Sequence, residues 1–173
     1  GHSVRTPWQA CRLARHDSTI CASLVDSRLL AGNDDLFEGF MRRFRQIVRL
    51  QPGRLMASIR ASRNEERLRY GETVFLLEPN VKRSRGALRD LQLLRWIGFA
   101  RYGLREPELL HQQGSLTDED FRALREANEF LLWLRNEMHF HAGQANDVLS
   151  RAEQLRVAEL LGYEPTAGLL PVE

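Results

Sequence analysis

Apolar residues recur every three or four positions along most of this chain, which is the period of an amphipathic α-helix. Residues 34–50 show it best, because Phe37, Phe40 and Phe44 share one face while arginines occupy the other. Such a helix packs its apolar face on a core and leaves its basic face in water. The same period predicts further helices at 7–16, 54–68, 87–102, 117–141 and about 146–162. The pattern therefore indicates a mainly α protein.

Capping and breaking residues mark the ends of these helices. Thr6 is a suitable N-cap, and Pro7 suits the first helical position, where an N–H would lack a partner. Pro52 and Gly53 separate two helices, and Gly103 is placed to end the helix at 87–102. These residues predict short connections between helices.

The stretch 107–120 contains two acids that resemble a metal-binding pair. Pro107 and Gly114 predict a loop or a short helix before them. Asp118 and Asp120 are spaced as D-x-D, but they lie at a helix start, where acids favour the helix dipole. Because Thr117 and Asp120 also have the spacing of a capping pair, we interpret these acids as part of the helix start.

Two stretches have β character. Residues 18–31 are rich in Thr, Ile, Val and Leu and predict a strand, although Leu, Ala and Ser leave a helix as the alternative. The run 73–77 is β-prone and ends before Pro79, which lacks an N–H and restricts its neighbour.

Composition narrows the possible functions. The 173 residues include 25 Lys and Arg and 23 Asp and Glu, for a net charge of +2, so we do not expect a nucleic-acid partner. Cys11 and Cys21 are too few for a disulfide framework or a zinc cluster. No apolar run reaches the roughly 18 residues of a membrane span, and no signal peptide is visible. We expect a cytoplasmic protein.

The most informative stretch is the cationic loop 78–90, which contains Lys82, the single lysine of the chain. It feeds the start of the helix at 87–102, with Gly86 at the entry. Main-chain N–H groups and the helix dipole favour anions at such a position. The loop therefore indicates either a contact to a phosphate or carboxylate, or a solvated linker that ends in a helix start.

Several motifs, in this order, resemble the bifunctional [protein-PII] uridylyltransferase/uridylyl-removing enzymes. They are Gly1–Thr6 (G-H-S-V-R-T), Asp26–Gly32 (D-S-R-L-L-A-G), Glu78–Lys82 (E-P-N-V-K), Gly86–Asp90 (G-A-L-R-D) and His139–Gly143 (H-F-H-A-G). A related G-G-I-R-D segment occurs in glutamine-synthetase adenylyltransferases. The chain departs from the family pattern at Ala87, usually a second glycine, at Ser84-Arg85, often Gly-Pro, and at Gln144, usually arginine.

The resemblance implies a metal role for Asp26. Nucleotidyltransferases of the DNA polymerase β type hold Mg²⁺ with three carboxylates, and Asp26 matches the third of them. Oxygen ligands suit this hard ion. The alternative is that Asp26 pairs with Arg28 on the same strand face. The other two carboxylates belong to a Gly-Ser…Asp-x-Asp segment, which the chain lacks, so the site is incomplete and we expect the isolated chain to be inactive.

The histidines do not predict a metal site. His139 and His141 are two positions apart on a helix and point to different faces, so they do not chelate one ion. The His16-Asp17 dipeptide lacks the further ligands of an HD phosphohydrolase. In the family that domain follows the helical region.

The resemblance implies an organisation and a function. We expect the end of a nucleotidyltransferase domain at 1–33, as a short α/β remnant, a helical bundle at 34–163 and a linker at 164–173, and thus a chain that begins inside a domain. The parent enzyme would transfer UMP from UTP to a tyrosine of the PII nitrogen-signalling protein, with Mg²⁺. Lys82 would meet phosphate charge, while Arg89 and Asp90 brace the loop. The alternative is a non-catalytic helical interaction or regulatory module beside a nucleotidyltransferase.

Overall fold

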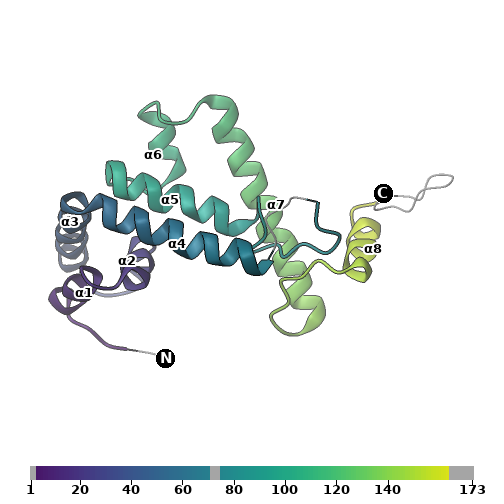
Figure 1. Cartoon of the computed structure of the whole chain (residues 1–173), viewed down its shortest axis with the longest axis horizontal. Helices are drawn as coiled ribbons and strands as arrows, with labels where there is room; N and C mark the ends of the chain where they lie inside the picture. Colours follow the sequence, from purple (N-terminus) through teal and green to yellow (C-terminus); the bar gives the residue numbers. More distant parts are fainter. Residues whose placement is uncertain (1–2, 71–74, 164–173) are drawn as a thin grey trace. The chain divides into compact units, whose positions relative to one another are not determined.

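The computed structural model describes residues 3–70 and 75–163 (Figure 1). Within those ranges the chain forms α-helices and no β-strand, so the mainly α class is confirmed. The helices are α1 (Pro7–Ala14), α2 (Ser18–Val25), α3 (Asp34–Leu50), α4 (Pro52–Tyr70), α5 (Leu88–Tyr102), α6 (Pro107–Gln112), α7 (Asp118–Ala142) and α8 (Arg151–Leu160). Across the described part, no helix combines the length and the apolar character that crossing a membrane requires.

The strand predicted within 18–31 is wrong, because Ser18–Val25 forms helix α2. Asp17 caps this helix, and its carboxylate accepts two main-chain N–H groups of the first turn, at 2.8 and 3.0 Å. Cys21 and Val25 then lie one turn apart, and both are buried. The cap and the shared buried face outweigh the β propensity of the individual residues.

The other strands expected from the sequence do not form within the described residues. The predicted α/β remnant at 1–33 contains α1 and α2, with no strand in its described part. Residues 73–74 of the β-prone run lie outside the described residues, and 75–77 do not form a strand. The β geometry seen in the described ranges is an isolated antiparallel bridge between Asn80 and Val148.

That bridge explains why the last helix begins later than expected. The spacing of apolar residues predicted that this helix starts near residue 146, but α8 begins at Arg151. Residues 147–149 instead pair with the loop through main-chain hydrogen bonds, Val81 N to Asp147 O at 2.8 Å and Leu149 N to Pro79 O at 2.9 Å. Ser150 then caps α8 by accepting from the N–H of Glu153.

The chain divides into two compact units. Unit 1 consists of Gly1–Asn64 and Gln92–Phe121, and unit 2 consists of Glu65–Leu91 and Arg122–Glu173. Helices α4, α5 and α7 each contribute to both. These units reflect contacts within the fold, and the domain boundaries expected at 33/34 and 163/164 stay a prediction.

Each unit has its own apolar core. In unit 1, Phe44 and Phe99 are almost fully buried and stack with ring centroids 5.3 Å apart. The remaining buried residues of this core are Cys11, Ala14, Cys21, Val25, Met41, Ile47, Val48, Leu55, Ile59 and Ala100. In unit 2, Val81 of the loop packs with Leu134, Met138 and Val157. The Lys82 loop is therefore anchored in a core at the residue next to its lysine.

Candidate functional site

The cationic loop 78–90 is held against the end of α7 and the start of α8 in unit 2. Beside the bridge and the two main-chain bonds above, the carboxylate of Glu78 accepts from Arg151 N at 2.9 Å. The side-chain amide of Gln154 donates to the carbonyl of Leu77 at 2.6 Å. Because these bonds join residues more than 70 positions apart, the loop is positioned by tertiary structure.

Inside the loop, Asn80 organises a tight turn. Its side-chain oxygen accepts from the main-chain N–H groups of Lys82 and Arg83, at 3.1 and 2.9 Å. Its own N–H donates to the hydroxyl of Ser84 at 2.8 Å, and Ser84 is 3% exposed. Lys82 is also fixed from the other side, because Arg89 N donates to its carbonyl at 2.9 Å. The main chain at Lys82 is thus held on both sides.

Arg89 and Asp90 lie at the end of the loop, in the first turn of α5. The Asp90 carboxylate accepts from Gly86 N at 2.7 Å. Gly86 has φ +79°, a left-handed conformation that favours glycine. Arg89 forms an ion pair with Glu66 of α4 at 3.5 Å. The buried Ala87, 5% exposed, fits the turn without a second glycine.

Asp147 is the charged centre beside this loop. Its Oδ1 accepts from Arg135 Nε at 2.7 Å and lies 2.9 Å from His139 Nε2. Arg135 and His139 are one turn apart on the same face of α7. Burial would raise the pKa of Asp147, but the hydrogen bonds from Arg135 and His139 and the charges of Arg135 and Lys82 together hold that pKa below its ordinary value. Asp147 is therefore ionised near neutral pH.

Glu153 forms a second cluster on the other side of the α7 terminus. Its Oε1 lies 2.8 Å from His141 Nδ1, and its Oε2 accepts from Arg156 Nη2 at 2.9 Å. Arg156 also donates to Glu137 at 2.9 Å. Burial opposes ionisation of Glu153, but the Arg156 and His141 hydrogen bonds lower its pKa. The two histidines thus bind different carboxylates, in agreement with their predicted different faces.

Asp147 and Glu153 were not predicted from the sequence. No local motif marks Asp147, whose side-chain partners lie on α7, and the available signal was the spacing of Arg135 and His139, one helical turn apart. Glu153 stands three residues after Ser150, the spacing of a capping box, and three residues before its partner Arg156.

Asp26 lies in unit 1, at the C-terminal end of α2. Its Oδ2 accepts from Gln92 Nε2 at 2.9 Å and from Trp96 Nε1 at 3.1 Å. Its Oδ1 faces Arg95 Nη2 at 3.5 Å, so Arg95, and not the expected Arg28, is its charged neighbour. Arg105 also contacts this region, because its Nη1 donates to the main-chain carbonyls of Val25 and Ser27, both at 2.6 Å. In this structure Asp26 joins α2 to α5.

The residues around Asp26 do not fit a complete Mg²⁺ site. Its contacts are hydrogen-bond donors and a cation, whereas Mg²⁺ requires further oxygen ligands. In the described ranges no group of three or more His, Cys, Asp or Glu side chains could hold a metal ion. We therefore derive no chemical step through a metal from these residues, and the metal role of Asp26 stays a prediction.

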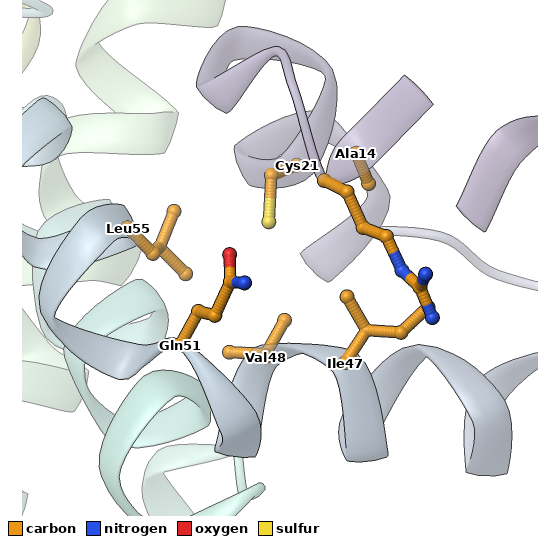
Figure 2. Close-up of a pocket in the computed structure, with 7 residues that line it drawn as sticks. Ala14, Cys21, Ile47, Val48, Gln51 and Leu55 are labelled. Carbon is orange, nitrogen blue, oxygen red and sulfur yellow. The ribbon is translucent and has the colours of Figure 1, made fainter. Parts of the chain in front are cut away.

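A small cavity in unit 1 is too small for a nucleotide. Its volume is about 30 Å³, which is room for little more than a water molecule. Figure 2 shows Cys21 and Gln51 pointing into it from opposite sides. Burial raises the pKa of Cys21 to about 11, so its thiol is not a nucleophile at neutral pH. The cavity is lined by Ala14, Arg15, Cys21, Ile47, Val48, Gln51 and Leu55.

Comparisons with known proteins agree with the resemblance. The family model GlnD PII-uridylyltransferase matches residues 54–173. A bifunctional uridylyltransferase/uridylyl-removing enzyme of Bradyrhizobium diazoefficiens is 34% identical over the whole chain. Proteins of that same description from Aromatoleum aromaticum and Burkholderia pseudomallei are 39% and 40% identical over 96% of it. No solved structure matches at a comparable level. The chain spans 19% of the length of each of these relatives. It belongs to the GlnD PII-uridylyltransferase family.

Proposed function

We propose that the protein is a uridylyltransferase that moves UMP from UTP to a tyrosine of a PII protein, and that this chain supplies the helical part beside the nucleotide. The observation that supports it most is the fixed Lys82 loop in a chain of this family. The family description names PII uridylyl transfer. We expect the reaction to take place in the cytoplasm.

Within this proposal Lys82 meets the phosphates of UTP. Its main chain is hydrogen-bonded on both sides, so its side chain projects from a fixed point. A main chain that is already fixed reduces the entropy that the loop loses when Lys82 binds a phosphate. Asp90 contributes by holding Gly86, and Arg89 by pairing with Glu66, so both act as braces for the loop.

Catalysis of the transfer needs groups beyond these. Mg²⁺ would neutralise phosphate charge in the reaction. Asp26 is the one carboxylate that the resemblance offers it, and the Gly-Ser…Asp-x-Asp segment does not occur in the 173 residues. We therefore expect the chain alone to bind UTP without transferring UMP. The uridylyl-removing activity named for the relatives is not assigned to any residue here.

Calorimetry of the chain with UTP and with ATP, each with Mg²⁺, tests the proposal. A hydrogen bond to a charged group contributes about 1.5–3 kcal/mol, so Lys82→Ala should weaken UTP binding at least about tenfold. Arg125→Ala is the matched control, because Arg125 is an exposed cation on α7 whose partner is Glu129. Comparison of the affinities for UTP and ATP shows whether the site prefers uracil over adenine.

Three results would count against the proposal. If Lys82→Ala and Arg125→Ala bind UTP as the wild type does, Lys82 does not meet the phosphates. If ATP binds more tightly than UTP, AMP transfer is the better assignment. If neither nucleotide binds at millimolar concentration, the chain is better described as a helical interaction or regulatory module. In a longer, active form of the enzyme, Lys82→Ala should lower turnover far more than the melting temperature.

A further inference from the structure

The Lys82 loop is a non-helical segment whose internal hydrogen bonds form a turn around Asn80 and join Val81 and Lys82 to Leu88 and Arg89. Residues 78–87 lie outside helices, and fixing each residue of such a segment costs about 1–2 kcal/mol of conformational entropy. The internal bonds shape the loop, and bonds to residues outside it fix where the loop lies against the end of α7 and the start of α8. Its attachment nearest to Lys82 is the hydrogen bond from Val81 N to the carbonyl of Asp147.

Asp147 is itself held through its side chain. Arg135 and His139 come from successive turns of α7, a helix that also supplies Leu134 and Met138 to the core under the loop. Arg135, His139 and Asp147 are each only 20–27% exposed at their side chains. Asp147 thus transmits the position of α7 to Val81, through a carboxylate on one side and a main-chain carbonyl on the other.

The charges around Asp147 also concern Lys82. Lys82 lies close enough for its charge to stabilise the Asp147 carboxylate, together with Arg135 and His139. The Asp147 carboxylate has Arg135 and Lys82 as charged neighbours, beside the imidazole of His139. These two cations would attract an anion such as a triphosphate, while the carboxylate restrains where they lie.

We propose that Asp147 is a positioning residue that fixes the Lys82 loop on α7 for phosphate binding, with Arg135 and His139 holding it in place. This inference rests on the proposed function, and it assigns a role to three residues outside the loop. Asp147 acts through Lys82 and does not touch the substrate itself.

The chain contains a matched control in Glu153. Like Asp147 it is a largely buried carboxylate that pairs with one histidine of α7 and one arginine. Its partners are His141 and Arg156, and its own N–H bonds to Ser150, which caps α8. Glu153→Gln should therefore lower stability about as much as Asp147→Asn without loosening the amides next to Lys82, because the start of α8 contacts the chain at Leu77 and Glu78.

Amide hydrogen exchange measures loop position without any nucleotide. The amides to follow are Val81, Leu88 and Arg89, whose N–H groups bond to Asp147, Val81 and Lys82. Asp147→Asn should reduce their protection about tenfold or more relative to other amides of unit 2, because local opening of the loop becomes easier. Glu153→Gln should leave the relative protection unchanged. Unchanged protection in Asp147→Asn, or equal loosening by both variants, overturns the proposal.

UTP titration of the same variants separates this inference from the proposed function. Asp147→Asn should weaken UTP binding in the wild-type background and add no further loss in the Lys82→Ala background, because it acts through Lys82. If Lys82→Ala weakens binding and Asp147→Asn does not, the positioning role is wrong and the proposed function stands. If the wild type binds no UTP, the proposed function fails and hydrogen exchange decides the positioning role. Should Asp147→Asn not fold, Arg135→Gln tests the same link.

Discussion

Asp26→Asn is the substitution that best separates a structural carboxylate from a metal ligand. The Asp26 carboxylate accepts from Gln92 and Trp96 and faces Arg95. Asparagine keeps one acceptor oxygen but loses the charge. A hydrogen bond to a charged group contributes about 1.5–3 kcal/mol against about 0.5–1.5 for a neutral one, so two such bonds lose about 2 kcal/mol. Because the Asp26 side chain is 27% exposed, solvent screening reduces the expected loss to about 1–2 kcal/mol.

The assay is urea unfolding followed by the fluorescence of the three tryptophans, of which Trp96 donates to the Asp26 carboxylate. We expect the free energy of unfolding to fall by about 1–2 kcal/mol, with a melting temperature lower by about 2–8 °C. Glu38→Gln is the control. Its ion pair with Arg42 is 3.5 Å long and about two-thirds exposed, so the loss should stay below about 0.5 kcal/mol.

Addition of Mg²⁺ decides between the two roles. A ligand that binds only the folded state stabilises it by RT ln(1 + [L]/Kd). If Asp26 binds Mg²⁺ in this chain, the ion should stabilise the wild type and have no effect on Asp26→Asn. If Asp26 braces α2 and α5, the variant is less stable at every Mg²⁺ concentration. An Asp26→Asn variant as stable as the wild type without Mg²⁺ would refute the bracing role.

Three further predictions concern unit 1. Gly98→Ala should destabilise the folded protein by about 1–3 kcal/mol in thermal unfolding, because a Cβ there would lie 2.8 Å from a main-chain carbonyl oxygen. Gly39→Ala should instead stabilise the folded protein by up to about 1 kcal/mol, because the nearest neighbour of its Cβ would be 3.8 Å away. Burial raises the pKa of Cys21 to about 11, so the folded state holds the thiol proton more tightly than the unfolded state. The free energy of unfolding should therefore be unaffected by this group below its ordinary pKa of about 9 and fall as the pH rises from there to about 11. Cys21→Ala should reduce this drop in pH-dependent urea unfolding, and Cys11, whose pKa burial also raises, contributes the remainder. Arg105→Ala should cost about 2 kcal/mol or more, because two carbonyls at the end of α2 lose a charged donor, and a urea midpoint equal to the wild type would contradict this.

The helical pattern and several helix ends could be predicted from the sequence because they depend on neighbours within one turn. Thr6 and Gln9 form the capping box at α1, and Thr117 accepts from Asp120 N at 3.1 Å at the start of α7. Gly103 has φ +73° at the end of α5. The motif order also identified the family, since it needs only the sequence.

The candidate site could be predicted only in part. The loop 78–90 was recognised from its charge and its entry into a helix, and the bond from Gly86 to Asp90 is short-range. Asp147 was not predicted because its side-chain partners Arg135 and His139 lie 12 and 8 residues away, across a change of direction. The contact of Glu153 with His141 spans 12 residues as well, whereas its pair with Arg156 has a spacing that is common on helix surfaces. Separations of 8 to 12 residues across a change of direction leave no periodic signal.

The sequence by itself determined that this chain is helical, where most helices start and stop, and to which family it belongs. Tertiary structure decided three things. Ser18–Val25 became a helix because Cys21 and Val25 are buried together, and residues 147–149 became extended because they pair with the loop. The Asp26 side chain contacts Gln92 and Trp96 of α5, which lie 66 and 70 positions later in the sequence. Residues 147–149 and Asp26 depend on partners that are distant in sequence, and α2 depends on the core that covers Cys21 and Val25, so these energies are absent until the chain has folded.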